Sequence, residues 1–367
     1  MKIAIAINTA WNIYNFRKSL VEHFISQGHH VLAIGSRDKY VKKLEDIGCH
    51  FVELPVNGSS VNPLKEFMLL IRFFWVLKKE APDFLLTYTI KPNIYGSILC
   101  RILQIPVICN VSGLGTTFVW KNIISEITIL LYNITVSYSD HIFFQNRDDL
   151  SLFLSKVPKR RGTTGLLNGS GINLQEFQVI KKDLNESLVF LMIGRLLVEK
   201  GIYEYVHAAE ICKQNGHKAE FQLLGKLDTT DPRSIAEKDL MKWKDDKIIN
   251  YLGTSHDVKN EIANADVIVL PSYREGTPRT LLEGAAMGKP LITTDVPGCR
   301  NVVENRINGL LCEAKSGTSL ASTIEEFLKL SKKDIKKMGE ESRRIMESKF
   351  DDKMVIFAYQ NVVDSLD

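Results

Sequence analysis

Short apolar runs alternate with longer helical segments along almost the whole chain of 367 residues. Residues 2–7 predict a buried strand, residues 14–27 a helix and residues 31–34 the next strand. This alternation predicts parallel sheets covered by helices, the doubly wound α/β class. The same order starts again at residues 188–193. Because the chain is also too long for one typical hydrophobic core, we expect two similar α/β domains.

Charge is divided unequally between the two halves. Residues 1–165 hold 19 Lys and Arg against 12 Asp and Glu, whereas the remainder holds 28 against 31. A basic surplus in the first half favours an anionic partner, either a phosphate-bearing substrate or an acidic membrane surface. Ordinary solvent-facing charge explains the surplus equally well, so charge alone leaves both interpretations open.

The cysteines argue against two classes of protein. All six are scattered and form no Cys-x-x-Cys pair, which disfavours a zinc knuckle and a disulfide framework. Buried thiols in a reducing compartment are expected instead. The amino-terminal strand lacks the apolar core and cleavage site of a signal peptide, and the uncharged residues 102–120 are too interrupted to span a membrane.

Two predicted helices have broad apolar surfaces. Residues 63–80 are apolar on more than one face, with cations such as Lys65 and Arg72 at the margins. Residues 122–137 form the second such segment. The pattern of residues 63–80 fits two interpretations: a helix packed on both sides, or an interfacial helix that faces lipid.

The stretch 272–284 predicts the end of a strand, a short loop and a helix. Thr277 suits the N-cap and Pro278 the first helical turn, so a helix of about three turns should follow. Glu275 precedes this helix and Glu283 lies inside it, so an extended ligand with an anionic middle could touch both carboxylates. Glutamates also favour helices and helix N-termini for structural reasons alone, and that interpretation stays open at this point.

The loop 194–201 also leaves a strand and enters a helix. Arg195 and Lys200 both fall at the carboxyl end of that strand. A diphosphate bound there would meet a guanidinium, an ammonium and free backbone N–H groups. No Asp-x-Asp pair stands at a comparable strand end, so we expect a diphosphate leaving group to be stabilised without a metal.

Two loops of the first half are weaker candidates for an anion site. Lys91 lies at the end of the predicted strand 82–87, where a lysine can reach a phosphate, although a surface lysine would look the same. Gly113 and Gly115 let backbone N–H groups approach an anion closely, although an ordinary turn has the same spacing.

Two motifs of the second half together resemble a known family. The run G-R-L-L-V-E-K-G at 194–201, followed by E-G-T-P-R-T-L-L-E-G at 275–284, resembles the family-4 retaining glycosyltransferases with the GT-B fold. Glu275 and Glu283 match the E-x7-E signature of that family. The runs T-I-K-P-N-I-Y-G at 89–96 and S-G-L-G at 112–115 resemble the branch that extends polyprenyl-diphosphate-linked sugars in bacterial surface polysaccharide or glycan assembly.

The resemblance implies a domain arrangement. Two Rossmann-like domains would face each other across a cleft. Residues 1–168 would bind the acceptor, residues 169–350 the nucleotide sugar, and a helix at 351–367 would cross back to the first domain.

The resemblance also implies roles for single residues. Arg195, Lys200 and Glu275 would be catalytic, the first two holding the donor diphosphate and Glu275 contacting the donor sugar. Glu283 would accept hydrogen bonds from the ribose. The other expected donor-binding residues are Gly194, Gly225, Tyr251, Leu252, Gly276, Thr277, Pro278, Arg279, Thr280 and Leu281. The expected acceptor-binding residues are Arg17, Lys91, Asn93, Gly113, Leu114 and Gly115.

The activity implied is retaining, metal-independent transfer of a hexose or N-acetylhexosamine from a nucleotide-diphosphate sugar, with UDP as the expected nucleotide. The acceptor would be a polyprenyl-diphosphate-linked saccharide. No cofactor, resident metal or nucleic-acid partner is expected. The enzyme would be cytoplasmic and peripheral, with helices 63–80 and 122–137 of the basic first domain on the anionic inner face of the cytoplasmic membrane.

The sequence departs from the family pattern in two places. Asn8-Thr9-Ala10 stands where many members have a Gly-Gly pair, which weakens the case for a donor phosphate contact from that loop. No histidine of the first half stands in an obvious cleft loop, so no general base is assigned. In a front-face mechanism the leaving phosphate can take the acceptor proton.

Other functions remain as rivals. A nucleotide-sugar 2-epimerase shares the expected architecture, and a glycosyltransferase with a soluble acceptor shares the donor motifs. A non-catalytic sugar-nucleotide sensor is disfavoured, since the diphosphate-neutralising residues and both glutamates are present. A nicotinamide-dependent enzyme is disfavoured because no G-x-G-x-x-G follows an early strand.

Overall fold

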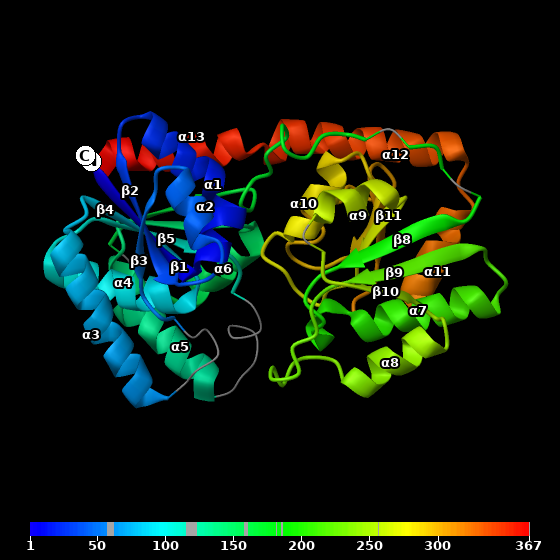
Figure 1. Ribbon diagram of the computed structural model, residues 1–367, viewed down its shortest axis with the longest axis horizontal. Helices are drawn as coiled ribbons and strands as arrows, with labels where there is room; N and C mark the ends of the chain where they lie inside the picture. The colour runs from blue at the N-terminus through cyan, green and yellow to red at the C-terminus, as the bar shows by residue number, and fades with distance from the viewer. Residues whose placement is uncertain are drawn as a thin grey trace. The chain divides into compact units, whose positions relative to one another are not determined.

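The computed structural model describes residues 1–56, 62–114, 123–157, 161–180, 182–184, 186–255 and 257–366, with residues 123–125 described by their backbone alone. The chain forms two compact units (Figure 1). The first comprises residues 1–170 together with 352–367, and the second comprises residues 171–351.

The first unit is built on a parallel sheet of seven strands in the order β3-β2-β1-β4-β5-β6-β7. The strands are β1 (Lys2–Thr9), β2 (His30–Ser36), β3 (His50–Glu53), β4 (Phe84–Tyr88), β5 (Val107–Val111), β6 (His141–Phe144) and β7 (Thr163–Leu166). Because all neighbours are parallel, their carboxyl ends share one edge of the sheet.

Helices cover both faces of this sheet. On one face lie α1 (Ala10–Ser26), α2 (Val41–Asp46) and α13 (Asp352–Leu366), and on the other α3 (Pro63–Glu80), α4 (Ile90–Leu103), α5 (Ile123–Ile134) and α6 (Arg147–Lys156). The strands supply both cores by alternation: Ile3 and Ile5 of β1 face the first layer, Ala4 and Ala6 the second.

The start of the chain differs from the prediction. The predicted strand at residues 2–7 and helix at 14–27 left a connecting loop between them, but β1 runs to Thr9 and α1 begins at Ala10. Thr9 caps the helix, since its side chain accepts a hydrogen bond from the Asn12 N–H at 3.2 Å. The cap satisfies a free helical N–H and lets the strand pass directly into the helix.

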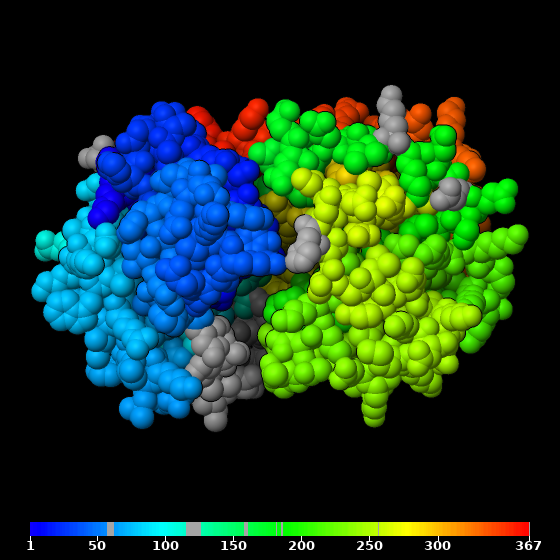
Figure 2. Space-filling view, in the orientation of Figure 1, coloured from blue at the N-terminus to red at the C-terminus, as the bar shows by residue number. Residues whose placement is uncertain are grey.

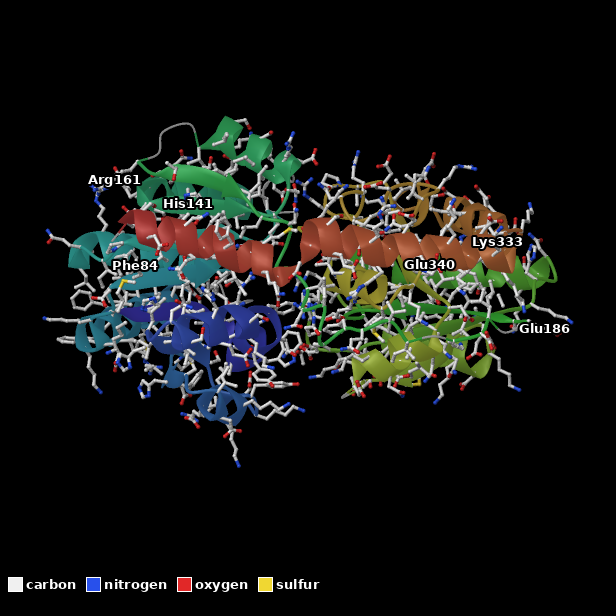
Figure 3. The ribbon with its side chains drawn as sticks, turned by 90° about the horizontal axis from the view of Figure 1, so that it is seen from above. Phe84, His141, Arg161, Glu186, Lys333 and Glu340 are labelled. Carbon is white, nitrogen blue, oxygen red and sulfur yellow. The ribbon has the colours of Figure 1, made fainter. Side chains whose placement is uncertain are left out.

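The second unit has six parallel strands in the order β10-β9-β8-β11-β12-β13. They are β8 (Leu188–Ile193), β9 (Ala219–Leu224), β10 (Asn250–Gly253), β11 (Val267–Leu270), β12 (Leu291–Thr294) and β13 (Gly309–Cys312). The helices are α7 (Ile202–Gln214), α8 (Glu237–Asp245), α9 (Val258–Asn264), α10 (Arg279–Ala286), α11 (Gly317–Leu328) and α12 (Lys332–Ile345). The outer face of α12 is charged with both signs, as at Lys333 and Glu340 (Figure 3).

The last helix belongs to the first unit. Val355, Tyr359 and Val363 of α13 are buried, at the spacing of one helix face. The Tyr359 hydroxyl accepts a hydrogen bond from Asn110 Nδ2 at 2.9 Å, and its ring lies 4.8 Å from that of Phe143. The chain therefore completes the core of its first unit with its final residues.

All six cysteines are buried free thiols, which confirms the predicted burial; the reducing compartment stays a prediction. No helix within the described ranges is both long and apolar enough to cross a bilayer.

Candidate functional site

Three loops of the second unit meet at the carboxyl edge of its sheet. They follow β8, β11 and β12 and cover residues 194–201, 271–278 and 295–299. The Tyr273 N–H donates to the Glu199 carbonyl at 2.9 Å, and the Glu275 N–H to the Pro297 carbonyl at 3.3 Å. These bonds fix the three loops to one another where ligands bind in open α/β sheets.

Glycines make this close approach possible. Gly201 has φ +79°, and a Cβ there would lie 2.1 Å from the Pro271 carbonyl oxygen. Gly298 has φ +84°, and a Cβ there would lie 2.4 Å from the Glu275 carbonyl oxygen. Neither position admits a side chain without moving the backbone of the neighbouring loop. The third loop was missed by the motif analysis, although the Pro297-Gly298 pair after a strand is its sequence signal.

Lys200 and Glu275 form an ion pair across two of these loops. Both side chains are mostly buried, with 21% and 14% of their surfaces exposed. Two residues that the sequence predicted for one site are thus in contact. Partial burial strengthens their attraction relative to a surface pair and holds the Glu275 carboxylate at the strand edge.

Arg195 lies at the end of β8 with an exposed guanidinium, which forms no ion pair with any described residue. The loop after β9 and the strand β10 both lie close to this strand end. A Cβ on Gly225 would lie 1.8 Å from the Gly194 carbonyl oxygen, and the Tyr251 hydroxyl donates to the Gly225 carbonyl at 2.9 Å. Gly194, Gly225 and Tyr251 therefore gather beside Arg195, whereas Leu252 packs partly against the core.

Glu283 is buried in α10, and Arg279 one turn earlier donates from Nε to its Oε1 at 3.0 Å. Burial raises the pKa of the Glu283 carboxyl, and the adjacent Arg279 guanidinium opposes that rise. A buried carboxylate with one arginine partner keeps acceptor capacity for further hydrogen-bond donors, such as hydroxyl groups.

The helix start near Glu275 differs from the prediction. Pro278 itself occupies the N-cap, Thr277 does not cap the helix, and α10 has eight residues. The expected length of three turns is therefore wrong, and about two are present. The Leu281 N–H donates to the Pro278 carbonyl at 3.2 Å, so it is already used inside the turn, while Gly276 and Thr280 remain partly accessible.

Lys91 and Asn93 of the first unit lie in the first turn of α4. Lys91 pairs with Glu66 of α3 at 2.7 Å, and Glu66 also accepts from the Tyr95 hydroxyl at 2.8 Å. Asn93 is buried and donates from Nδ2 to the Asn110 carbonyl at 3.0 Å. Both side chains are therefore held by protein partners at the carboxyl edge of the first sheet.

The other expected acceptor residues are placed differently. The Leu114 N–H, after Gly113, donates to Asp149 Oδ2 at 3.2 Å. Gly115 lies outside the described residues. Arg17 is only 4% exposed, and its guanidinium lies 4.2 Å from the centre of the Tyr88 ring. Contact of Arg17 with an acceptor would require this side chain to become accessible, so its role stays a prediction.

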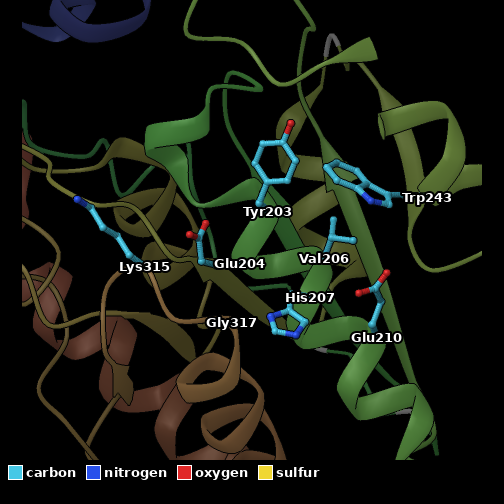
Figure 4. Close-up of a pocket in the computed structure, with 8 residues that line it drawn as sticks. All are labelled: Tyr203, Glu204, Val206, His207, Glu210, Trp243, Lys315 and Gly317. Carbon is cyan, nitrogen blue, oxygen red and sulfur yellow. The ribbon is translucent and has the colours of Figure 1, made fainter. Parts of the chain in front are cut away.

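A hollow of about 360 Å³ lies elsewhere in the second unit (Figure 4). Its lining is supplied by α7, by Trp243 of α8, by Lys315 and by Gly317, the first residue of α11. Glu204 of this lining accepts a hydrogen bond from the Tyr273 hydroxyl at 2.6 Å and so supports the loop that carries Glu275. None of the expected donor-binding residues lines this hollow.

Metal ligands do not gather at these loops. Within the described ranges, no three His, Cys, Asp or Glu side chains lie together as metal ligands would. Metal independence itself stays a prediction.

Comparison with known proteins identifies related sequences over both units. The family model for "Glycosyl transferase 4-like" proteins matches residues 2–146, and that for "Glycosyl transferases group 1" matches residues 175–345. A Campylobacter jejuni N,N'-diacetylbacillosaminyl-diphospho-undecaprenol alpha-1,3-N-acetylgalactosaminyltransferase is 27% identical over 348 residues, 89% of each chain. An Escherichia coli UDP-Gal:alpha-D-GlcNAc-diphosphoundecaprenol alpha-1,3-galactosyltransferase is 25% identical over 284 residues, 74% of this chain and 73% of its own.

Solved structures show the same fold. Anabaena Alr3699/HepE, in complex with UDP and glucose, superimposes with a TM-score of 0.80 at 16% identity over the whole of both chains. Sucrose-phosphate synthase from Thermosynechococcus elongatus gives a TM-score of 0.81 at 18% identity, covering 100% of this chain and 99% of its own. The predicted GT-B fold, with two parallel-sheet α/β domains, is confirmed.

Proposed function

We propose that this chain, which belongs to the glycosyltransferases that join a 4-like domain to a group 1 domain, extends a saccharide carried on a polyprenyl diphosphate. It would transfer a hexose or N-acetylhexosamine from a nucleotide-diphosphate sugar, with UDP as the nucleotide. The observation that carries the proposal is the Lys200–Glu275 ion pair at the carboxyl edge of the second sheet, the edge at which Arg195 follows β8. Two of the relatives named above use acceptors of this lipid-linked kind, which supports the choice of acceptor.

The proposed reaction is retaining and needs no resident metal or cofactor. The bond between the anomeric carbon and the donor phosphate breaks, and the acceptor hydroxyl forms a bond to that carbon on the same face of the sugar. The departing phosphate oxygen takes the hydroxyl proton. Arg195 and Lys200 would stabilise the charge that develops on the diphosphate, which is where preorganised cations lower the barrier most.

Two carboxylates would hold the donor at its two ends. Glu275 would bind hydroxyls of the reacting sugar, fixed in place by its pair with Lys200 and by its backbone bond to Pro297. Glu283 would accept hydrogen bonds from the ribose hydroxyls, held in place by its hydrogen bond from Arg279 Nε. The acceptor would bind to the first unit, near Lys91 and Asn93.

The acceptor places the reaction at a membrane. A polyprenyl chain is held in a bilayer, so we propose that the enzyme is cytoplasmic and works peripherally at the inner face of the cytoplasmic membrane. The basic surplus of residues 1–165 suits an anionic surface of that kind.

Substitution at the donor loops tests the site. Lys200→Ala should lower kcat by about 10²–10³, the loss seen when one charge-stabilising group is removed, and Glu283→Ala should weaken donor binding. Nucleotide release from a defined lipid-linked acceptor is the measurement, with circular dichroism as a check of folding. Lys333→Ala and Glu340→Ala on the exposed face of α12 are the matched controls and should leave turnover unchanged. Full turnover by Lys200→Ala would rule out the assignment, and conversion of the donor without an acceptor would indicate an epimerase instead.

A further inference from the structure

The outer face of α3 is an exposed apolar stripe. It consists of Leu64, Phe67, Met68, Ile71 and Trp75, with Leu64 75% and Trp75 59% exposed. The spacing of three and four residues places them on one side of the helix. Figure 2 shows the light-blue side chains of this helix at the outer edge of the first unit.

The inner face of α3 is the one that packs. Leu69, Phe73 and Leu77 are buried in the core of the first unit. Packing on both faces, one of the two interpretations of residues 63–80, is therefore wrong. The exposed stripe is not needed for the fold, because the helix is anchored without it.

A second exposed stripe lies on α5. Ile127, Leu130 and Ile134 are all at least half exposed, and they recur at helical spacing. Tyr132 of α5 and Phe73 of α3 are buried in the same core cluster. Both helices thus cover the same face of the first sheet, and both stripes point away from it.

The charges around the α3 stripe are of one sign. Its two carboxylates are neutralised from other elements, Glu66 by Lys91 and Glu80 by Lys2 at 2.9 Å. Its four cations, by contrast, are exposed and form no ion pair with a described residue: Lys65, Arg72, Lys78 and Lys79. The exposed face is therefore apolar in the middle and positively charged at its margins.

An apolar stripe with cations at its margins suits an anionic lipid surface. Lys78 Nζ lies 5.3 Å from the Trp75 ring, so an aromatic group and a cation stand together. Aromatic and aliphatic side chains can enter the boundary between headgroups and acyl chains while flanking lysines stay at the anionic headgroups. The outer face of α12 shows the contrasting pattern, with charges of both signs.

We propose that the outer faces of α3 and α5 dock this chain on a bilayer of anionic lipid. The proposal extends the proposed function, since it names the surface by which the enzyme would meet a membrane-held acceptor. Leu64, Phe67, Ile71 and Trp75 enter the interface, and the four cations bind the headgroups.

Vesicle sedimentation tests the apolar part of the surface. The chain should sediment with vesicles of phosphatidylglycerol and phosphatidylcholine in equal parts, less with added salt and least with phosphatidylcholine alone. The double variant Phe67→Ser, Trp75→Ser should bind at least about tenfold more weakly. Phe357→Ser is the matched control: this aromatic on α13 is 67% exposed, and its loss should leave binding unchanged.

A charge pair tests the basic margin. Lys78→Glu with Lys79→Glu should weaken binding to the anionic vesicles by roughly tenfold or more, whereas Lys332→Glu with Lys333→Glu on α12 should have little effect. Equal vesicle binding by the wild type and the Phe67, Trp75 variant would overturn the proposal. The proposal would also be overturned if the wild type bound no vesicles and was a dimer, while the Phe67, Trp75 variant was a monomer. The stripe would then join two copies of the chain.

Transfer to a water-soluble, short-chain acceptor separates this proposal from the proposed function. The α3 variants should retain wild-type kcat/KM with that acceptor. Vesicle binding lost while soluble transfer persists supports docking by α3. If all variants bind vesicles normally and still transfer sugar, the docking proposal is wrong and the proposed function is unaffected. If the wild type transfers no sugar but the α3 substitutions still weaken vesicle binding, the proposed function is wrong and the docking proposal is supported.

Discussion

Lys200 has a single ammonium group, and in the structure it pairs with Glu275. An anion bound at the end of β8 would share that ammonium and draw it partly away from the carboxylate. Glu275 would then be available to hydroxyl donors, while its backbone stays bonded to Pro297. If the proposed anion site is correct, the pair would keep both groups in position before binding and would separate when the anion binds.

Gly201 offers a test of the loop contact at the level of one residue. Gly201→Ala should destabilise the second unit by well over the ~1–2 kcal/mol that a left-handed backbone costs an alanine, because its Cβ would also collide with the Pro271 carbonyl. Gly216→Ala is the matched control, since Gly216 has φ +77° and no atom within 4 Å of a Cβ. Urea unfolding of both variants is the measurement. Equal losses would contradict the steric explanation.

His141 should make the first unit sensitive to acid. Burial lowers the pKa of this imidazole from 6.5 to about 4, and its Nδ1 lies 2.7 Å from Thr163 Oγ1 (Figure 3). The unfolded chain takes up the proton first on acidification, so stability is lost as the pH falls from 6.5 towards 4, by up to about 3 kcal/mol. In His141→Asn, whose amide can replace Nδ1 but does not titrate, unfolding free energy should change less over this range. Parallel profiles for the two proteins would argue against the assignment.

Helices and strands were predicted correctly where a single sequence pattern determined the type and the bounds of the element. Residues 63–80 and 188–193 match α3 and β8, since a helix begun by Asn62 and Pro63 and a run of six apolar residues leave little choice. The start of α1 was placed late, because Asn8 and Thr9 look like a loop until the cap at Thr9 is seen. The length of α10 was overestimated because Pro278 was placed in its first turn, whereas Pro278 is the N-cap and the helix begins at Arg279.

The candidate site was predictable only in part, for a related reason. The motifs at 194–201 and 275–284 predicted that Lys200 and Glu275 belong to one site. The carboxyl ends of parallel strands share one edge of the sheet, so the two loops could be expected to meet. The pairing of Lys91 with Glu66 joins residues that only the fold brings together, and no local pattern announces it. The burial of Arg17 against the Tyr88 ring likewise joins α1 to β4, which are far apart in the sequence.

The closing helix provides a test at the level of one element. Tyr359→Ala should destabilise the first unit by about 3–5 kcal/mol, because it empties a fully buried site and strands the Asn110 amide. Phe357→Ala, two residues away and exposed, should change stability by less than about 0.5 kcal/mol. Hydrogen exchange resolved by peptide is the measurement. It should accelerate in β1 and β4 but not in β8 or β11, and uniform acceleration would contradict the assignment of α13 to one unit.

At the scale of the whole molecule, the two units have separate cores and opposite charge balances. One hydrophobic cluster fills the second unit, whereas two clusters cover the two faces of the first sheet. The positive unit carries the apolar stripes of α3 and α5, and the negative unit carries the Lys200–Glu275 loops. The properties proposed for lipid contact and for donor chemistry are therefore assigned to different parts of one chain.

The position of α13 also has a consequence for synthesis. The ribosome releases residues 1–170 long before residues 352–367, the segment that covers one face of their sheet. At ordinary elongation rates the intervening residues take on the order of ten to forty seconds to make. During that time the apolar groove destined for Val355, Tyr359 and Val363 is open to solvent on the nascent chain. Completion of the first unit is thus delayed until α13 has been synthesised, and until then an apolar surface of the kind that promotes aggregation stays exposed on the nascent chain.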